Sequence, residues 1–560
     1  GNLPGAQDTA LVFRREDGVR RVWSWAELRN ATAAARRGLV EAGVGAGDVV
    51  AAWMPNTPET VIVMLAAQSL GAVFTSTSPD FGPSGVLDRF GQVAPKVLVA
   101  ADGYVYGGKN HDRTEALAQI VRWLPTVQQV WLVHELDHDA EPEVHIRTRY
   151  LRDILAAGVD ALEFVEMPFD APGFILYSSG TTGAPKCLVH RSAGLLLKHA
   201  SEHRWHLDVR PGDRVFWFTT CGWMMWNWLV SALAAGATVV LYDGSPFHPE
   251  PDHLWRIAEE EQVSLFGVSA KYLDACAKQG LRPVVDRDLS SLRTIGSTGS
   301  PLSPEAFRYV YADVAPEVHL ASISGGTDIC GCFVIGDPTL PVWPGELQGP
   351  ALGADVDVFD DDGRSLRGEA GVTGELVCRN ALPSMPISFL GDPSGDRYNA
   401  AYFERFPGVW SHGDFALWTD HDGMMILGRS DATLNAGGVR IGTAEIYRQV
   451  EAFDEVLEAL AIGQAFDDDT RVVLFVRLAP GHHLDDLLRA RIVKRLREQC
   501  SPRHVPAKIV EVADLPRTRS GKLAELAVAD VVHGRPVRNT EALANPESLG
   551  LFTDLEELRT

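Results

Sequence analysis

Apolar positions in the first part of the chain follow two alternating periods. Runs with the 3.6-residue period of an amphipathic helix are separated by short β-branched and aromatic runs typical of buried strands. Helices are predicted over residues 25–44 and 59–71, strands over residues 49–54 and 72–78, and a passage from helix to strand over residues 121–133. Short apolar strands separated by helices predict a layered α/β domain with largely parallel sheets.

The pattern changes twice further along the chain. From about Ala351, alternation of apolar and polar residues with Asp-Gly turns predicts hairpins and a β-rich subdomain. A smaller unit begins after Gly428, with helices predicted over residues 443–453 and 485–500 and strands over residues 459–466 and 471–479. We therefore expect an α/β protein, in which a large N-terminal domain of layered α/β subdomains and a β-rich subdomain is followed by a smaller α+β C-terminal domain.

One segment, Val215 to Tyr242, contains no charged residue and is rich in tryptophan. A run of this length could span a bilayer. Its two ends, VFWFTT and ATVVLYD, are β-branched and aromatic like strands, whereas the middle, WNWLVSALAAG, favours a helix. We predict a strand, a turn, a buried helix and a second strand, and we take the membrane span as the minor alternative.

Composition narrows the possible partners. The chain has 560 residues, with 51 Lys or Arg against 74 Asp or Glu and a formal net charge of −23. An acidic total disfavours binding to nucleic acid or to an anionic membrane, which requires a basic face. The stretch 488–522 is an exception with ten basic and three acidic residues, which gives 10 − 3 = +7. We expect this local basic element to approach an anionic ligand.

Seven scattered cysteines are best interpreted as buried, reduced thiols of a cytosolic protein. The chain opens Gly-Asn-Leu-Pro, without Met or an apolar signal stretch. We therefore expect no export signal and a cytoplasmic location, and a truncated start is the alternative.

Two segments could form a phosphate-binding loop. The first, Gly103 to Asn110, fits GxxxxGK but has Asn where the Mg²⁺-binding Ser or Thr would stand. Its residues Tyr104 to Tyr106 also suit an extended strand, so we interpret this match as a coincidence.

The second segment, YSSGTTGAPK, covers residues 177–186 and lies between an apolar strand and an apparent amphipathic helix. Glycines leave backbone N–H groups accessible, hydroxyls add donors, and a lysine supplies positive charge for a polyphosphate. The residues concerned are Ser178, Ser179, Gly180, Thr181, Thr182, Gly183 and Lys186. The alternative, a surface turn rich in Ser, Thr and Gly, does not account for all of these features together.

With this loop, the chain resembles the adenylate-forming superfamily, which includes acyl-CoA synthetases, adenylation domains and luciferases. Further motifs follow in the order found in that family and cover nearly the whole chain: GSTGSPL (296–302), SISGGTD (322–328), WSHGD (410–414), GRSDATLNAGGVRIGTAEIY (428–447) and PRTRSGK (516–522). Four other segments are similar to those of acetoacetyl-CoA synthetases: SPDFG (78–82), CGWMMWNW (221–228), ISGGTDICGCF (323–333) and ANPESLGLF (544–552).

The resemblance implies a ligase that works in two half-reactions. A carboxylate, acetoacetate in the subfamily, attacks the α-phosphate of ATP and releases pyrophosphate. The thiol of coenzyme A then attacks the acyl-adenylate and releases AMP. The first step brings negative charge onto negative charge, so cations, including Mg²⁺, and oriented N–H donors must offset it.

The catalytic residues implied by the resemblance are Lys522, Thr327 and Asp328. Lys522 would bridge the carboxylate and the α-phosphate, and Thr327 would donate a hydrogen bond to that phosphate. Asp328 would hold Mg²⁺, in a position where the family more often has Glu.

Nucleotide-binding and hinge residues are implied in the same way. Asp414 would accept hydrogen bonds from both ribose hydroxyls, for which a carboxylate is well suited. The segment Gly299, Ser300 and Pro301 would lie along the adenine. Arg429 would contact the ribose-phosphate region and Arg440 a phosphate, although both arginines could equally form structural ion pairs.

Asp431 matches the hinge of the family. We therefore expect residues 1–428 to form the large domain, residues 429–431 the hinge, and residues 432–560 a mobile small domain. Rotation of the small domain would present Gly437 and Gly438 to the channel for the coenzyme A thiol, where side chains would obstruct it.

The tryptophan-rich block coincides with the acyl pocket of short-chain synthetases. We expect Trp223, Trp226 and Asn227 to line the pocket, although some of these side chains must be core. A donor for the ketone oxygen could be Asn227, the indole N–H of Trp223 or Thr220.

Three alternatives to an acetoacetate ligase stay open at this point. The first is a ligase for another short acid such as acetate, propionate or 3-hydroxybutyrate. The second is an adenylation domain that serves a carrier protein. The third, of a different class, is an inactive nucleotide-binding regulator.

Overall fold

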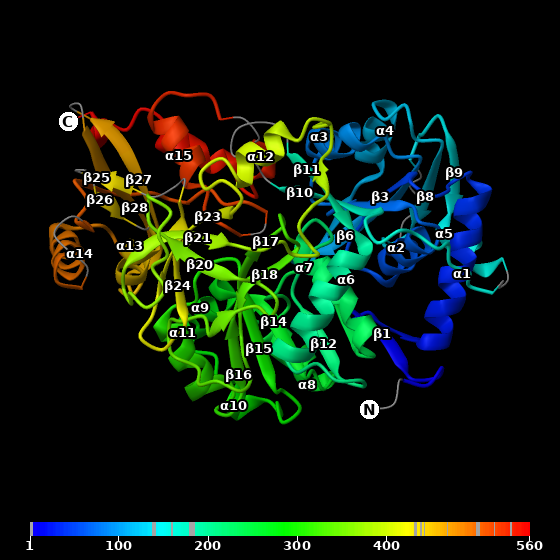
Figure 1. Cartoon of the computed structure of the whole chain (residues 1–560), viewed down its shortest axis with the longest axis horizontal. Helices are drawn as coiled ribbons and strands as arrows, with labels where there is room; N and C mark the ends of the chain where they lie inside the picture. Colours follow the sequence, from blue (N-terminus) through cyan, green and yellow to red (C-terminus); the bar gives the residue numbers. More distant parts are fainter. Residues whose placement is uncertain are drawn as a thin grey trace.

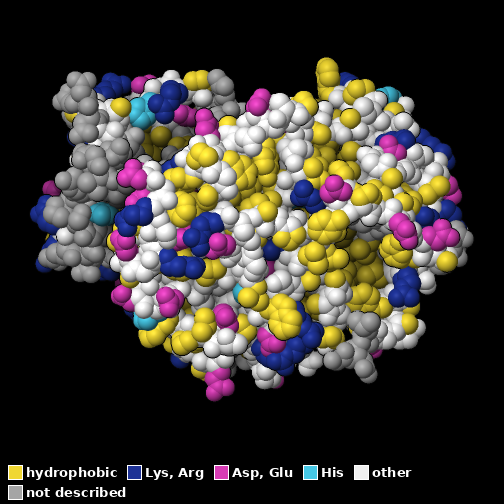
Figure 2. Space-filling model, viewed as in Figure 1, with side chains coloured by type: hydrophobic (Ala, Val, Ile, Leu, Met, Phe, Trp, Pro, Cys, Tyr) yellow, Lys and Arg dark blue, Asp and Glu magenta, His cyan; other side chains and the backbone are white. Residues whose placement is uncertain are grey.

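The computed structural model describes most of the chain and shows two large sheets side by side, with helices around them (Figure 1). The residues it describes are 4–136, 142–157, 161–178, 185–430, 434–436, 439–441, 443–466, 469–499, 504–519, 521–537 and 540–559. Acidic and basic side chains are interspersed over the face in Figure 2, so the net negative charge is not gathered in one patch there.

The first sheet has seven strands in the order β16-β15-β14-β12-β13-β1-β2. All neighbours pair in parallel except β1 and β2, which form an antiparallel hairpin. Its strands are β1 (Thr9–Arg15), β2 (Arg20–Ser24), β12 (Arg214–Trp217), β13 (Thr238–Asp243), β14 (Leu265–Ser269), β15 (Thr294–Thr298) and β16 (His319–Ser322). Its carboxyl ends lead directly into the tryptophan-rich block and the predicted adenine segment, which is where open α/β sheets usually bind ligands.

The second sheet has eight strands in the order β22-β11-β10-β4-β3-β5-β8-β9. It is parallel from β10 to β9, whereas β10, β11 and β22 pair antiparallel. The bounds are β3 (Val49–Trp53), β4 (Val73–Thr77), β5 (Val97–Ala101), β8 (Gln129–Val133), β9 (Arg147–Tyr150), β10 (Pro172–Ser178), β11 (Lys186–Arg191) and β22 (Ser388–Phe389).

Helices cover both sheets, and their beginnings follow from local sequence. Ser24 and Glu27 form a reciprocal capping box at the start of α1 (Trp25–Glu41). The other helices of this part are α2 (Pro58–Ser69), α3 (Pro83–Val93), α4 (Thr114–Arg122), α5 (Leu151–Ala156), α6 (Ser192–Ser201), α7 (Met224–Val230), α8 (His253–Glu260), α9 (Ala270–Lys278), α10 (Pro283–Asp286), α11 (Pro304–Tyr309) and α12 (Asp396–Tyr402). The predicted layered α/β arrangement is confirmed.

The segment from Val215 to Tyr242 forms a strand, a turn, a short buried helix and a second strand, as predicted. Here β12 leads into α7, which continues as the 3₁₀ helix Ser231–Ala235 before β13 begins. Among the residues that the structure describes, no helix combines the length and the apolar composition needed to cross a membrane.

A separate four-stranded antiparallel sheet follows and confirms the predicted hairpins. Its order is β20-β21-β23-β24, and the strands are β20 (Val356–Phe359), β21 (Thr373–Cys378), β23 (Trp410–Trp418) and β24 (Met424–Arg429). A smaller sheet, β17 (Ser324–Gly326), β18 (Gly331–Ile335) and β19 (Gly349–Pro350), carries the SGGTD motif.

The C-terminal part of the chain has cores of its own. Two buried clusters consist only of residues from Leu434 onward, and one of them includes Phe552 and Leu558 of the C-terminal tail, the part of the chain after about Val531. The elements are β25 (Leu434–Ala436), β26 (Val439–Ile441), α13 (Thr443–Val450), β27 (Val456–Phe466), β28 (Asp469–Leu478), α14 (Asp486–Gln499), β29 (Lys508–Glu511) and α15 (Glu525–Val532). This is the predicted α+β composition, and the tail packs as part of it.

The GxxxxGK segment forms a hairpin, β6 (Gly103–Tyr106) and β7 (Lys109–Asp112). The turn residues Gly107 and Gly108 both have positive φ, and their N–H groups donate to the Glu16 carboxylate at 2.9 and 2.7 Å. A protein carboxylate therefore already occupies these donors, which confirms that the match to a phosphate loop is a coincidence.

Helix α9 and strand β27 are joined by ionic contacts around Glu458. Its carboxylate accepts from Lys271 at 2.7 Å and from Arg477 at 2.7 Å, and it also contacts Arg517. Burial by itself would raise the pKa of Glu458, but the charges of Lys271 and Arg517 outweigh it and bring this pKa to about 2.

We predict an acid-sensitive contribution of Glu458 to stability. Because its folded pKa is depressed, the stabilisation is fully present above the unfolded value of about 4.5 and is lost as pH falls toward about 2. Replacing Glu458 with Gln should therefore lower the free energy of unfolding by about 2 kcal/mol at neutral pH and by less at about pH 3. Urea midpoints of both proteins across this range give the measurement, and an equal loss at both pH values would contradict the assignment.

Candidate active site

Lys522 lies in a tight turn that begins at Arg517. The N–H of Thr518 donates to the carbonyl of Lys522 at 2.7 Å, and the N–H of Lys522 donates to the hydroxyl of Thr518 at 3.1 Å. Arg517 and Leu523 form an isolated antiparallel bridge that closes the turn. The backbone is thus fixed on both sides of the lysine, whose long side chain is directed by the turn.

The ammonium of Lys522 faces charged groups from the N-terminal part of the chain. The residue is exposed, yet the surrounding protein desolvates its ammonium and lowers its pKa. The carboxylates of Asp414 and Asp328 act in the opposite direction and favour the charged form. Lys522, Asp414 and Asp328, which are predicted to work together, therefore lie close enough to interact electrostatically.

Thr327 and Asp328 lie in the turn between β17 and β18. The Thr327 carbonyl is held by the buried ring of His190 at 3.1 Å. The Thr327 hydroxyl has no hydrogen-bond partner within the described part of the chain, so it is available to a ligand.

The Asp328 carboxylate accepts a hydrogen bond from the hydroxyl of Tyr402. Burial opposes ionisation of Asp328, but His412, Tyr402, Arg429 and Lys186 outweigh it, so its pKa is lowered. An ionised carboxylate at this position suits a hard cation. Among the described residues there is no group of three or more His, Cys, Asp or Glu that could hold a metal, so Asp328 would need oxygen ligands from a substrate.

Asp414 is positioned by the four-stranded sheet. It lies directly opposite Arg429 in the β23–β24 pair, and Arg429 donates to it at 3.2 Å. The segment before it is fixed by buried Glu375 of β21, which accepts from the N–H of Gly413 at 2.7 Å and from the Ser411 hydroxyl at 3.0 Å. Asp414 and Arg429 therefore present a carboxylate and a guanidinium side by side.

The structure corrects the local surroundings predicted for the phosphate loop. The loop lies between two antiparallel strands, because β10 ends at Ser178 and β11 begins at Lys186; the helix starts only at Ser192. The segment Cys187 to His190, for which no strand was predicted, is buried in β11 between β10 and β22. The element that directly follows the loop is therefore a strand and not the N-terminus of a helix.

Several predicted positions fall outside the described residues. These are Ser179, Gly180, Thr181, Thr182 and Gly183 of the phosphate loop, Asp431 of the hinge, and Gly437 and Gly438. The backbone of Arg440 lies in β26, opposite Asn435, but its side chain is also outside the described part.

The predicted adenine segment follows the carboxyl end of β15. Gly299 has a φ of +95°, which favours glycine and turns the chain sharply away from the strand. Ser300 and Pro301 follow in this turn, and Pro301 is exposed. The segment therefore borders the same edge of the sheet as the tryptophan-rich block.

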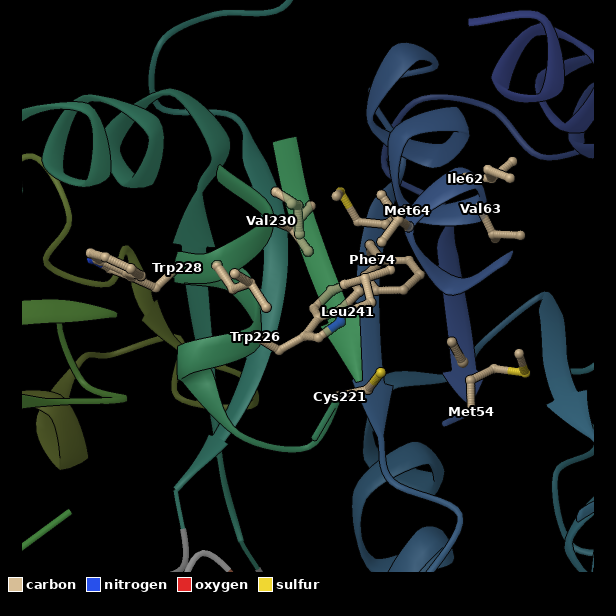
Figure 3. Packing of buried hydrophobic residues seen from close by; sticks show 14 of the residues in the cluster. Met54, Ile62, Val63, Met64, Phe74, Cys221, Trp226, Trp228, Val230 and Leu241 are labelled. Atoms are coloured by element: carbon tan, nitrogen blue, oxygen red, sulfur yellow. The ribbon is translucent and has the colours of Figure 1, made fainter. Parts of the chain in front are cut away.

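The predicted pocket tryptophans have different surroundings. Trp226 is fully buried, donates its indole N–H to Asn56 at 3.0 Å and stacks against Phe74, whereas Trp223 is only half-buried. Figure 3 shows Trp226 and Trp228 on opposite sides of α7. The Asn227 side chain is buried, and among the described residues its amide has no hydrogen-bond partner. Trp223 and Asn227 thus have groups free to meet a ligand, while the indole N–H of Trp226 is already bonded.

Three residues that contact the predicted site were not identified from the sequence. His190 holds the Thr327 carbonyl, Tyr402 donates to Asp328, and His412 lies 3.6 Å from the Asp414 carboxylate. His412 stands inside the WSHGD motif and could have been noticed there. No local signal marks the other two, because each lies more than 70 residues from its partner.

Comparison with known proteins decides the family. A model described as AMP-binding enzyme matches residues 4–385, and one described as AMP-binding enzyme C-terminal domain matches residues 449–522. The chain belongs to the AMP-binding enzyme family.

Among AMP-binding enzymes, three similar proteins carry the same name. An acetoacetyl-coenzyme A synthetase of Rhizobium meliloti (strain 1021) is 57% identical and covers 98% of this chain and 84% of its own length. The acetoacetyl-CoA synthetase of Mus musculus is 44% identical, over 95% of this chain and 80% of its own. The solved structure of an acetoacetyl-CoA synthetase from Streptomyces lividans superposes with a TM-score of 0.92 at 44% identity, and covers 99% of this chain and 84% of that one.

Proposed function

We propose that this protein ligates acetoacetate to coenzyme A through an acetoacetyl-adenylate, with release of pyrophosphate and then AMP. The observation that supports the proposal is the electrostatic proximity of Lys522 to Asp328 and Asp414, in a chain 57% identical to a protein named acetoacetyl-coenzyme A synthetase. ATP and coenzyme A are the cosubstrates.

In the first half-reaction, a carboxylate oxygen of acetoacetate attacks the α-phosphorus of ATP and the bond to pyrophosphate breaks. Lys522 neutralises charge on both reactants, and the Thr327 hydroxyl donates to an α-phosphate oxygen. Asp414 accepts from the ribose hydroxyls, and Arg429 fixes that carboxylate and faces the ribose-phosphate.

Asp328 would hold Mg²⁺ together with phosphate oxygens of ATP. Such an ion supplies additional positive charge to the triphosphate. The low pKa of Asp328 supports this role, since its carboxylate is ionised at neutral pH. Ser178 to Gly183 and Lys186 would surround the departing pyrophosphate.

Transfer to coenzyme A needs a second arrangement of the chain. We propose that residues 1–428 and 432–560 are two domains that rotate about residues 429–431, with Asp431 as the hinge. The rotation would remove Lys522 from the cleft and bring Gly437 and Gly438 to the thiol channel, while Arg440 contacts a phosphate. Steps of this kind commonly limit turnover.

The acyl group would lie against Trp223, with Trp226 behind it and Asn227 as the donor to the ketone oxygen. Asn227 is a buried residue whose amide has no hydrogen-bond partner among the described residues, which supports this choice over exposed Thr220. A site built to hydrogen-bond a ketone discriminates against butyrate, which leaves the donor unpaired.

We predict that Trp223→Ala raises the KM for acetoacetate by about tenfold, because roughly 1–3 kcal/mol of packing against a small acyl group is lost. The KM for ATP should stay unchanged, since the proposal places Trp223 against the acyl group and not against the nucleotide. Steady-state kinetics with each substrate varied in turn test this, and unchanged acetoacetate kinetics would remove Trp223 from the pocket.

The function itself is tested by pyrophosphate release with a panel of short acids, with and without coenzyme A. We expect release that depends on acetoacetate, and acetoacetyl-CoA only when coenzyme A is present. Preference for acetate, propionate or 3-hydroxybutyrate would identify another short-chain ligase. Release without thioester would favour an adenylation domain, and no release with any acid would favour a nucleotide-binding regulator.

We also infer a cytoplasmic location. The six cysteines in the described part of the chain are all free and buried, which suits a reducing compartment.

A further inference from the structure

Trp217 closes the carboxyl end of β12 on the same side of the sheet as α7. It is fully buried and belongs to the core cluster that contains Trp226 and Trp228, against which Trp223 also packs. The tryptophan-rich block follows β12 within a few residues, and β15 leads into the adenine segment. Trp217 therefore stands at the end of the strand that leads into the region where the proposed function places the acyl group.

A transverse row of small residues receives the indole of Trp217. Trp217 pairs with Gly267 of β14, Gly267 pairs with Gly296 of β15, and Gly296 pairs with Ala321 of β16. A Cβ atom added at Gly267 would lie 2.0 Å from the indole, and one added at Gly296 would lie 2.7 Å from it. The two glycines thus leave a hollow across the sheet that a single side chain, Trp217, fills.

The indole of Trp217 also packs against Trp228, which is itself held in place. Trp228 meets Trp217 edge to face, with ring centroids 5.2 Å apart. Trp228 is itself fixed by a hydrogen bond of 2.8 Å to the buried carboxylate of Glu202. The indole N–H of Trp217 has no partner in the described part of the chain. The ring is therefore confined by shape alone and cannot move aside for a longer substrate without displacing Trp228.

We propose that Trp217 is the floor of the acyl pocket and sets the upper limit on acid chain length. The inference rests on the proposed function, because it needs an acyl pocket above β12. Without the indole, the hollow over Gly267 and Gly296 becomes an apolar channel that extends the pocket. An aliphatic tail is the ligand chemistry that such a dry channel accepts. Trp217 is thus a specificity-determining residue for the ligation of short acids.

The test compares wild type with Trp217→Ala and Trp217→Leu on acetoacetate, butyrate, hexanoate and octanoate, measured as kcat/KM for thioester formation. We expect the ratio of hexanoate to acetoacetate to rise at least tenfold in Trp217→Ala, and to rise less in Trp217→Leu, which fills part of the hollow. A gain with long acids cannot come from loss of folding, so it separates the role in specificity from a role in packing alone.

Trp255→Ala is the matched control. Trp255 is an equally buried tryptophan, but it packs on the opposite face of the sheet against Phe266. We expect its replacement to lower stability without changing the order of acids. The inference is overturned if folded Trp217 variants keep the wild-type order of acids, or if wild type already uses octanoate as well as butyrate. Wild-type preference for a short acid other than acetoacetate would instead overturn the proposed substrate, and the comparison of chain lengths would still decide the role of Trp217.

Discussion

Replacing Lys522 with Met is expected to lower the rate of acetoacetate-dependent ATP–pyrophosphate exchange by about 10²–10³-fold, the typical loss when one donor to a developing oxyanion is removed. Methionine keeps the length and the apolar stem of the side chain but removes the charge. Lys522 comes from the C-terminal part of the chain, and its ammonium lies near enough to the Asp414 and Asp328 carboxylates for their charges to favour its protonated form. Exchange reports the first half-reaction alone, so it isolates the step in which this charge acts.

The second half-reaction supplies the contrast for Lys522. Thioester formation from chemically prepared acetoacetyl-adenylate and coenzyme A should stay within a few-fold of wild type, because the proposed rotation removes Lys522 from the cleft before that step. Lys109→Met serves as a control, since Lys109 is an exposed lysine in the β6–β7 hairpin. An equal loss in both half-reactions would show that Lys522 does not act selectively in adenylation.

The order of elements and the fold class follow from the sequence because the hydrophobic periods are strong and local. The Ser24–Glu27 capping box and the apolar runs of β3, β4 and β8 depend on neighbours in the chain. Strand β11 was missed because its partners are β10 and the distant β22, and its sequence continues without a break into the helix that follows. This segment forms a strand because of its tertiary pairing, and local propensity alone does not predict that pairing.

The residues of the candidate site also fall into two groups, those that a local motif identifies and those that only tertiary contacts bring to the site. Motifs identify the residues that we propose to contact a ligand, such as Lys522, Thr327 and Asp414, because their chemistry is tied to a short segment. Residues that position these groups, such as His190 and Tyr402, make their contacts through the fold and carry no local signature. In the basic stretch 488–522, some of the charge takes part in ion pairs within the protein. Arg491, Arg517 and Arg519 pair with Glu455, Glu458 and Asp80, so a structural role accounts for part of its charge.

Removal of the Glu202 carboxylate is expected to destabilise the folded protein more than the loss of Glu458 does. Glu202 is fully buried, and it accepts from the N–H of Cys332 at 2.8 Å and from the indole of Trp228 at 2.8 Å. Its other neighbour is the ammonium of Lys198, 3.2 Å away and also buried. We expect Glu202→Ala to lower the free energy of unfolding by about 3–5 kcal/mol, because it leaves Lys198 buried without a counter-charge.

A double variant distinguishes two possible causes of this loss of stability, an unpaired buried charge and the loss of hydrogen bonds. If the buried ammonium is the cause, the double variant Lys198→Met, Glu202→Leu should recover most of the loss, because an apolar pair of similar volume needs no compensation. Glu305→Ala is the surface control: Glu305 pairs with Arg308 at 3.0 Å with both side chains exposed, and its loss should cost within about 1 kcal/mol. Denaturant unfolding of the four proteins provides the free energies. A double variant as unstable as Glu202→Ala would assign the loss to the hydrogen bonds that fix Trp228 and β18, and not to the charge of Lys198.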